Sequence, residues 1–180
     1  MKKLKHLFIL ALLATAQPTV AQEADNTGFN LIVLGDSQTQ TEAQIDSFES
    51  DIMPAIASIL AEYDREDDTP EAILITGDVV WDNMKFLPRV KADFEALGVP
   101  VYAVIGNHDH NKLYERNQKR AEKNYVDAWG ERNQAFMLGE TLFVTLDNID
   151  YTDFSAYGLK VDADQLIWLA DVMEQYADVE

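Results

Sequence analysis

The sequence contains no cysteine in its 180 residues, which excludes disulfide bonds, thiolate nucleophiles and cysteine-ligated metal sites. Basic residues are also few, because 14 Lys and Arg stand against 32 Asp and Glu and give a net charge of −18. A surface of this sign repels nucleic acid and anionic lipid, so we expect no nucleic acid polymer as a partner. Apolar residues nevertheless make up 47% of the chain, which is enough for a folded domain with a core.

Long apolar runs are also absent. The run LFILALLATA at residues 7–16 is about half the ~20 residues that a membrane-spanning helix needs. It follows three lysines and precedes small residues that end at Ala21. This order predicts an export signal over residues 1–21, cleaved near Ala21, then a linker over 22–28. We therefore expect a periplasmic or secreted protein without a stable membrane anchor.

The remaining sequence alternates between strand and helix patterns. Apolar runs predict strands at 29–35, 71–77 and 99–106, and helical spacing predicts helices at 41–62, 83–97 and 112–128. Residues 134–148 predict a hairpin with a turn at Gly139-Glu140, and residues 162–176 an amphipathic helix with Asp162 and Gln165 at capping-box spacing. The pattern predicts one α/β domain over residues 29–180, with a mostly parallel sheet followed by a hairpin.

Each of the three predicted parallel strands ends in glycine followed by polar residues. The three ends read Gly35-Asp36-Ser37-Gln38, Gly77-Asp78 and Gly106-Asn107-His108-Asp109. Ligands bind beyond the carboxyl ends of such strands, so Asp36, Asp78 and Asn107 should lie in one crevice. Carboxylates sharing a crevice repel each other, and a divalent cation removes that cost. Oxygen and nitrogen donors of this kind suit Mn, Fe or Zn.

The chain has only three histidines, and one of them, His6, lies in the predicted signal. The other two, His108 and His110, both fall in the third strand-end motif. This concentration indicates that the motif carries chemistry.

The segments GDSQTQT, GDVVWDN, IGNHDH, TLDNIDY and QLIWL together resemble the calcineurin-like metallophosphoesterases, most closely exported bacterial members with Gln in the first motif. The resemblance spans residues 29–172. It implies the first half of an α/β/β/α sandwich. It also implies hydrolysis of small phosphate mono- or diesters at a dinuclear centre of two divalent ions.

The resemblance also implies roles for individual residues. Asp36 and Gln38 correspond to ligands of the first metal, Asp78 to the carboxylate that bridges both ions, and Asn107 to a ligand of the second. His108 corresponds to the catalytic imidazole, and Asp109 to the acid that orients it. The residues expected to line the substrate cleft are Trp81, Asp82, Asn83 and His110.

The sequence departs from the family pattern in its second half. The family supplies further histidines there, whereas no histidine follows His110. We therefore expect a domain incomplete at its C-terminal end, weakly active or inactive, which self-associates through an exposed sheet face.

Two alternative functions remain open. The chain could be a non-catalytic fragment with residual metal binding. It could also be a GDSL-type esterase with Ser37 as nucleophile, although the late Asp-x-x-His of those enzymes is absent. The acidic stretch at 147–154 is expected to be a solvated loop.

Overall fold

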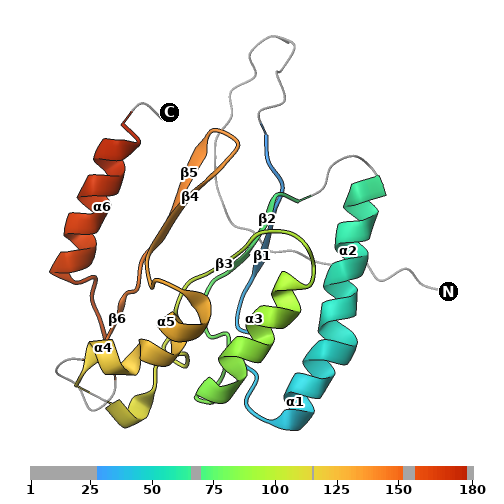
Figure 1. The fold of residues 1–180 in the computed structure, drawn as a ribbon, viewed down its shortest axis with the longest axis horizontal. Coiled ribbons are helices and arrows are strands. Elements are labelled where there is room, and N and C mark those ends of the chain that lie inside the picture. Colours follow the sequence, from blue (N-terminus) through green and yellow to red (C-terminus); the bar gives the residue numbers. More distant parts are fainter. Residues whose placement is uncertain (1–27, 66–69, 115, 152–156, 178–180) are drawn as a thin grey trace.

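The structure is a computed structural model that describes residues 28–65, 70–114, 116–151 and 157–177 (Figure 1). The predicted export signal and all but the last residue of the predicted linker lie outside the described residues. Within the described residues, no helix is long and apolar enough to cross a membrane.

A three-stranded parallel sheet forms the centre of the molecule. Strands β1 (Leu31–Leu34), β2 (Ala72–Ile75) and β3 (Val101–Ala103) pair in the order β1-β2-β3. Leu31 pairs with Ala72, and Ile73 pairs with Val101. The parallel order confirms the predicted βαβ units, and it brings the three strand-end motifs to one edge of the sheet.

Helices cover one face of this sheet. The first crossover contains α1 (Glu42–Ser47), the π-helical segment η1 (Phe48–Ile52) and α2 (Met53–Arg65), where the sequence predicts a single helix. The second contains the 3₁₀ turn η2 (Met84–Phe86) and α3 (Leu87–Glu95). Their apolar sides meet the sheet in the main core, whose fully buried members include Ile45, Ile73, Ile75, Leu87 and Val90.

A third helical region packs beside α3. The 3₁₀ turn η3 (Lys112–Tyr114) leads to α4 (Gln118–Ala121) and α5 (Lys123–Trp129). Two buried side chains of α5 fix the position of the helix through hydrogen bonds. The Tyr125 hydroxyl donates to the Ala103 carbonyl, and the Trp129 indole N–H donates to the Leu87 carbonyl.

A hairpin lies against the other face of the sheet. Strands β4 (Gln134–Leu138) and β5 (Thr141–Thr145) pair antiparallel around the predicted Gly139-Glu140 turn. Phe136 stacks on Tyr102 of β3 with ring centroids 3.4 Å apart. The expectation of an uncovered sheet face is therefore corrected in part: Ala72 is fully buried beneath the hairpin cluster, whereas Val33 remains 45% exposed.

The chain continues through the short strands β6 (Ile149–Asp150) and β7 (Gly158–Leu159) to α6 (Ala163–Gln175), which lies beyond the hairpin in the view of Figure 1. Asp162 caps α6 by accepting from the Gln165 N–H, as the sequence predicts. The Gln165 side chain also bonds to the backbone of Asp147. Its amide oxygen accepts from the Asp147 N–H, and its amide nitrogen donates to the Asp147 carbonyl.

Candidate metal centre

The three strand-end motifs meet at the carboxylate of Asp78. One oxygen, Oδ2, accepts from the Gln38 side-chain amide at 3.2 Å, which brings in the first motif. The other, Oδ1, accepts from the backbone N–H of His108 at 3.0 Å, which brings in the third. The Gln38 N–H also donates to the Asp78 carbonyl at 3.0 Å. Each oxygen of one carboxylate is thus directed to a different motif.

The backbone around this carboxylate adopts an unusual conformation. Asp36, Gln38 and Asp78 have φ values of 51°, 46° and 49°, in the left-handed region that non-glycine residues seldom enter. Such conformations cost of order 1–3 kcal/mol each and cluster at functional sites. The third motif also approaches closely, because a Cβ on Gly106 would collide with the backbone N and Oδ1 of Asp78. The fold therefore holds these loops in place at an energetic cost.

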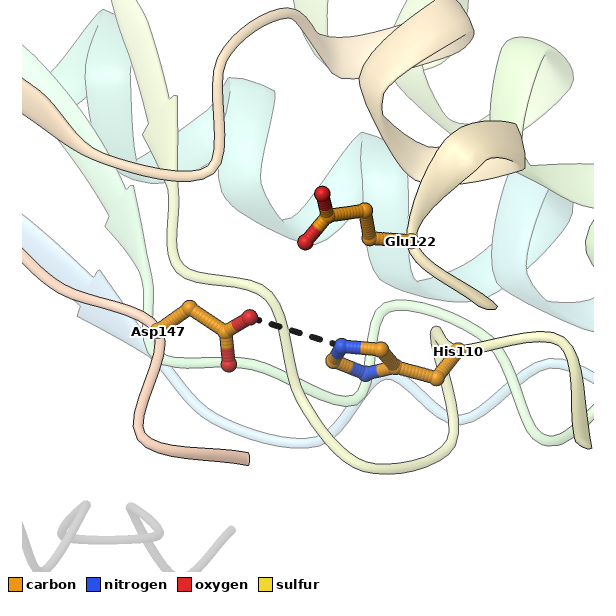
Figure 2. Close-up of side chains that lie close together, drawn as sticks. All are labelled: His110, Glu122 and Asp147. Atoms are coloured by element: carbon orange, nitrogen blue, oxygen red, sulfur yellow. Dashed lines mark ion pairs between the residues drawn. The ribbon is translucent and has the colours of Figure 1, made fainter. Parts of the chain in front are cut away.

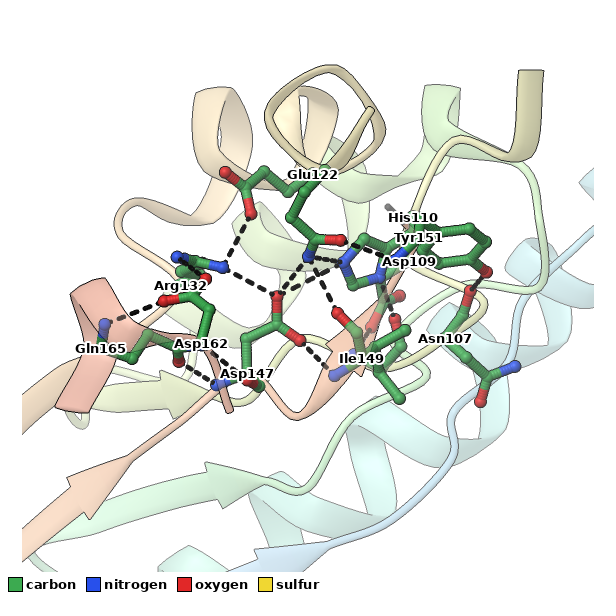
Figure 3. A network of polar contacts seen from close by, with 12 residues as sticks. Asn107, Asp109, His110, Glu122, Arg132, Asp147, Ile149, Tyr151, Asp162 and Gln165 are labelled. Carbon is green, nitrogen blue, oxygen red and sulfur yellow. Dashed lines mark hydrogen bonds and ion pairs between the residues drawn. The ribbon is translucent and has the colours of Figure 1, made fainter. Parts of the chain in front are cut away.

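The remaining two predicted ligands flank this centre. Asp36 is exposed in the first loop, and Asn107 is half-buried in the third. The Asn107 carbonyl accepts from the Tyr151 hydroxyl at 3.0 Å, while its side chain points away from that contact (Figure 3). Asp36, Gln38, Asp78 and Asn107 together offer carboxylate and carboxamide oxygens, which divalent cations bind.

Two side chains hold the His108 ring, and a third fixes one of them. Its Nδ1 lies 2.9 Å from Asp82 Oδ1, and the Trp81 indole stacks on the ring with centroids 3.9 Å apart. Lys112 donates to Asp82 Oδ2 at 2.9 Å. Partial burial alone would raise the pKa of Asp82, but the bonds from Lys112 and His108 hold that pKa below its usual value. Asp82 is therefore an anion, and it places the His108 proton on Nδ1.

Asp109 occupies a different position from the one that the resemblance implies. Its carboxylate is fully buried and accepts from the N–H groups of Val80 at 2.9 Å and Gly106 at 2.8 Å. Burial raises the pKa of Asp109 to about 6, although these backbone bonds oppose the rise. The carboxylate in contact with His108 is that of Asp82, and Asp109 fastens the third loop to the second.

The other predicted cleft residues separate into surface and interior positions. Trp81 is 38% exposed, and the Asn83 side chain donates to the Gln40 carbonyl at 2.6 Å. A cavity of about 410 Å³ opens beside Ser37, Gln38 and η1. His110, in contrast, is fully buried, so the structure places it in the interior and not on a substrate cleft.

His110 belongs to a buried polar network that the sequence does not predict. Its ring, Glu122 and Asp147 offer ligand atoms that all lie within 4.8 Å of one another (Figure 2). His110 Nδ1 contacts the Gly106 carbonyl at 2.8 Å, and Nε2 lies 3.5 Å from Asp147 Oδ2. Asp147 is fully buried, which corrects the expectation of a solvated loop at this point of the chain.

The network already contains its own cation. Arg132 NH1 lies 3.5 Å from Glu122 Oε2 and 3.6 Å from Asp147 Oδ2, and NH2 lies 2.6 Å from Asp162 Oδ2 (Figure 3). Burial raises the pKa of Glu122, and the guanidinium opposes that rise. His110, Glu122 and Asp147 could ligate a metal. The Arg132 guanidinium, however, already lies within 3.6 Å of both carboxylates and supplies the positive charge that would compensate them.

Several residues around the site escape prediction from sequence. Gln118 and Arg132 contact the motifs only through the fold, and no local pattern marks them. Tyr151 ends the TLDNIDY segment, but its contact with Asn107, 44 positions away, depends on the fold. Lys112 carries a faint signal, since it is a cation four residues after His108 in an acidic chain. Ser37 donates its hydroxyl to the Val79 carbonyl at 2.8 Å, and this bond offers no support for a serine nucleophile.

A model of the calcineurin-like phosphoesterase family matches residues 29–179, which include every strand-end motif. No curated protein matches the chain significantly.

Proposed function

We propose, from the premise that the chain belongs to the calcineurin-like phosphoesterase family, that it hydrolyses small phosphate mono- or diesters at a centre of two divalent ions. The family implies a metal-dependent hydrolase that acts on ester bonds. The dinuclear centre, the ligand set and the activity of this chain are the proposal.

The observation that carries the proposal is the position of Asp78 between the first and third motifs. Its Oδ2 accepts from Gln38, and its Oδ1 accepts from the His108 N–H. A carboxylate so placed can face two ions, with Asp36 and Gln38 toward one and Asn107 toward the other. A half-turn of the Gln38 carboxamide would present its oxygen where its nitrogen now lies.

The donor set fits divalent cations. Its carboxylate and amide oxygens lie on loops with left-handed backbone conformations at Asp36, Gln38 and Asp78. The lack of space for a Cβ at Gly106 fixes how closely the second and third loops approach each other. Bound ions would stabilise charge on the phosphoryl oxygens and lower the pKa of a water molecule. None of the four residues offers an imidazole, so we infer weak metal binding and low turnover. The candidate ions are Mn, Fe and Zn.

The protein's own groups supply positioning and proton transfer. Asp82 accepts from His108 Nδ1–H and orients the ring, so that Nε2 of the doubly protonated imidazolium can donate its proton to the leaving oxygen. Trp81 covers one face of the imidazole and keeps it from rotating. Lys112 neutralises Asp82, which lowers the repulsion between this carboxylate and an anionic substrate.

The decisive experiment compares two carboxylate variants of the full chain. Asp78→Asn should abolish Mn²⁺ binding in calorimetry and hydrolysis of p-nitrophenyl phosphate and its bis ester. Asp127→Asn, on the exposed side of α5, should leave both unchanged. Unaltered metal binding by Asp78→Asn would refute the centre. Metal binding without turnover in the wild type would favour the non-catalytic alternative.

Residues 1–21 are proposed to direct export and to be removed near Ala21. Intact mass of the protein recovered from a periplasmic or secreted fraction tests this. A mature chain that retains residues 1–21 would contradict it.

A further inference from the structure

We propose that Tyr151 is a positioning residue for the metal centre. Its hydroxyl holds the Asn107 peptide and so fixes where the Asn107 side chain can lie. This inference rests on the proposed function, because it takes Asn107 to be a ligand. Tyr151 contacts the Asn107 peptide, and the Asn107 side chain points away from that contact (Figure 3).

The contact between Tyr151 and Asn107 is well defined. The tyrosine is 1% exposed, and its hydroxyl donates to the Asn107 carbonyl at 3.0 Å. The two residues are 44 positions apart, so the bond is a product of the fold. The neighbouring carbonyl of Gly106 contacts the His110 ring at 2.8 Å. Consecutive carbonyls of the third loop are thus each held by a buried side chain.

Gln118 on α4 fixes Tyr151 in turn. Its Oε1 accepts from the Tyr151 N–H at 2.9 Å. Its Nε2 donates to Asp147 Oδ2 and to the Ile149 carbonyl, both at 2.9 Å. The same nitrogen also lies 3.3 Å from His110 Nε2, and a flipped amide would set its oxygen against the Asp147 carboxylate and the Ile149 carbonyl. The Gln118 side chain therefore has a single orientation, and it sets the backbone position of Tyr151.

Asp147 anchors this segment further. The Gln165 side chain bonds to both the N–H and the carbonyl of Asp147 at 2.8 Å. Asp147 Oδ1 accepts from the Ile149 N–H at 2.8 Å. The hydroxyl of Tyr151 is therefore placed by a chain of bonds that begins with buried bonds at α6 and continues through partly buried bonds of Gln118. Groups that orient metal ligands in this way typically change metal affinity or activity about 10–100-fold when removed.

The fold offers a matched control for the loss of this bond. Tyr125 is also fully buried, and its hydroxyl donates at 2.9 Å to the carbonyl of Ala103, on the strand that leads to the same loop. Tyr151→Phe and Tyr125→Phe each delete one hydroxyl that donates to a backbone carbonyl. Only the first bond reaches a proposed ligand.

The test is Mn²⁺ titration of the full chain, followed by calorimetry and by the electron paramagnetic resonance signal of coupled Mn²⁺ ions. Tyr151→Phe should weaken one of the two sites about 10-fold or more and reduce the coupled signal. The other site should change less than about 2-fold. Tyr125→Phe should match the wild type in both readouts. Thermal unfolding of each variant reports the folded fraction.

Gln118→Met provides a second variant should Tyr151→Phe fold poorly. It removes the acceptor for the Tyr151 N–H and keeps the ring and hydroxyl, so we expect a smaller loss at the same site. Wild-type affinity in folded Tyr151→Phe, or an equal loss in Tyr125→Phe, would overturn the positioning role. Full binding of both ions by Asn107→Ala would instead refute the ligand assignment in the proposed function.

Discussion

Gly106 provides the sharpest test of how the second and third loops fit together. A Cβ at this position would lie 2.2 Å from both the backbone N and the Oδ1 of Asp78 and 3.0 Å from its Cα. The carboxylate oxygen could turn aside, but the two backbone atoms cannot move without moving the loop. Gly106→Ala must therefore push the two loops apart. The bond from the His108 N–H to Asp78 Oδ1, now 3.0 Å long, would lengthen or break.

The size of the effect follows from these two losses. Overpacking a tight site costs roughly 1–3 kcal/mol, and a bond to a charged acceptor contributes roughly 1.5–3 kcal/mol. We expect Gly106→Ala to lower the free energy of unfolding by about 3–5 kcal/mol. At roughly 2–4 °C per kcal/mol for a chain of this size, the Tm should fall by about 6–20 °C.

Gly35→Ala is the appropriate control, because Gly35 ends β1 in the same way as Gly106 follows β3. A Cβ there would meet only Thr76 Oγ1, at an ordinary 3.4 Å. Urea and thermal denaturation of the metal-free variants would give both values, and Mn²⁺ titration would report the site. A stability of Gly106→Ala within about 0.5 kcal/mol of the Gly35→Ala value would refute the close approach of the loops.

Three further perturbations test other parts of the structure. Asp82→Asn should lower kcat about 10–100-fold and alter the pH–rate profile through His108, with metal content unchanged by elemental analysis. Gln165→Leu leaves the N–H and carbonyl of Asp147 buried without partners, so the free energy of unfolding in urea should fall by about 2–5 kcal/mol. Burial raises the pKa of Asp109 from 3.8 to about 6, so its contribution to stability is full below pH 4 and is lost as the pH rises through 6. The metal-free wild type should therefore lose about 3 kcal/mol relative to Asp109→Asn between pH 4 and pH 7 in urea titrations.

Each of these predictions has a contrary outcome. Wild-type kcat in Asp82→Asn would mean that the imidazole needs no carboxylate partner. A stability change in Gln165→Leu no larger than that of Gln175→Leu, at the end of the same helix, would show that the Asp147 backbone finds other partners. A constant difference between Asp109→Asn and the wild type across this pH range would show that the carboxyl does not titrate there.

The strand-end motifs were predictable because their signal is local. An apolar run followed by glycine and an acid marks the end of a buried strand, and the βαβ pattern then orders the strands in parallel. Asp36, Asp78 and Asn107 fall on the three loops at one edge of the sheet for that reason. The hairpin was equally local, since its turn residues lie between two short apolar strands.

The partner of His108 was not predictable from neighbouring positions. Asp109 is adjacent in sequence, but its side chain turns back to the N–H of Gly106, three residues earlier, as short acidic side chains in turns commonly do. Asp82 lies 26 residues away and reaches the imidazole only because β2 and β3 are neighbours. Position in the sheet decided the contact, and adjacency in the sequence did not.

The buried network was hidden for a related reason. Residues 147–154 are rich in acids, and such composition normally indicates solvent exposure. Asp147 is buried because Gln118, Arg132 and Gln165, which come from three separate parts of the chain, satisfy it together. No window of sequence contains these partners.

Local sequence patterns identify the proposed ligands of the centre, whereas the residues that hold those ligands in place are brought together only by the tertiary fold. Asp36, Gln38, Asp78 and Asn107 all precede residue 110, on loops that local patterns identify. The bonds that hold the third loop from outside come from Tyr151, which Gln118 orients and which the bonds around Asp147 anchor. The geometry of the centre is consequently a property of the whole described fold, because a strained loop keeps its conformation only where surrounding structure determines it. Metal affinity should then respond to changes in the buried network as well as to changes in the ligands.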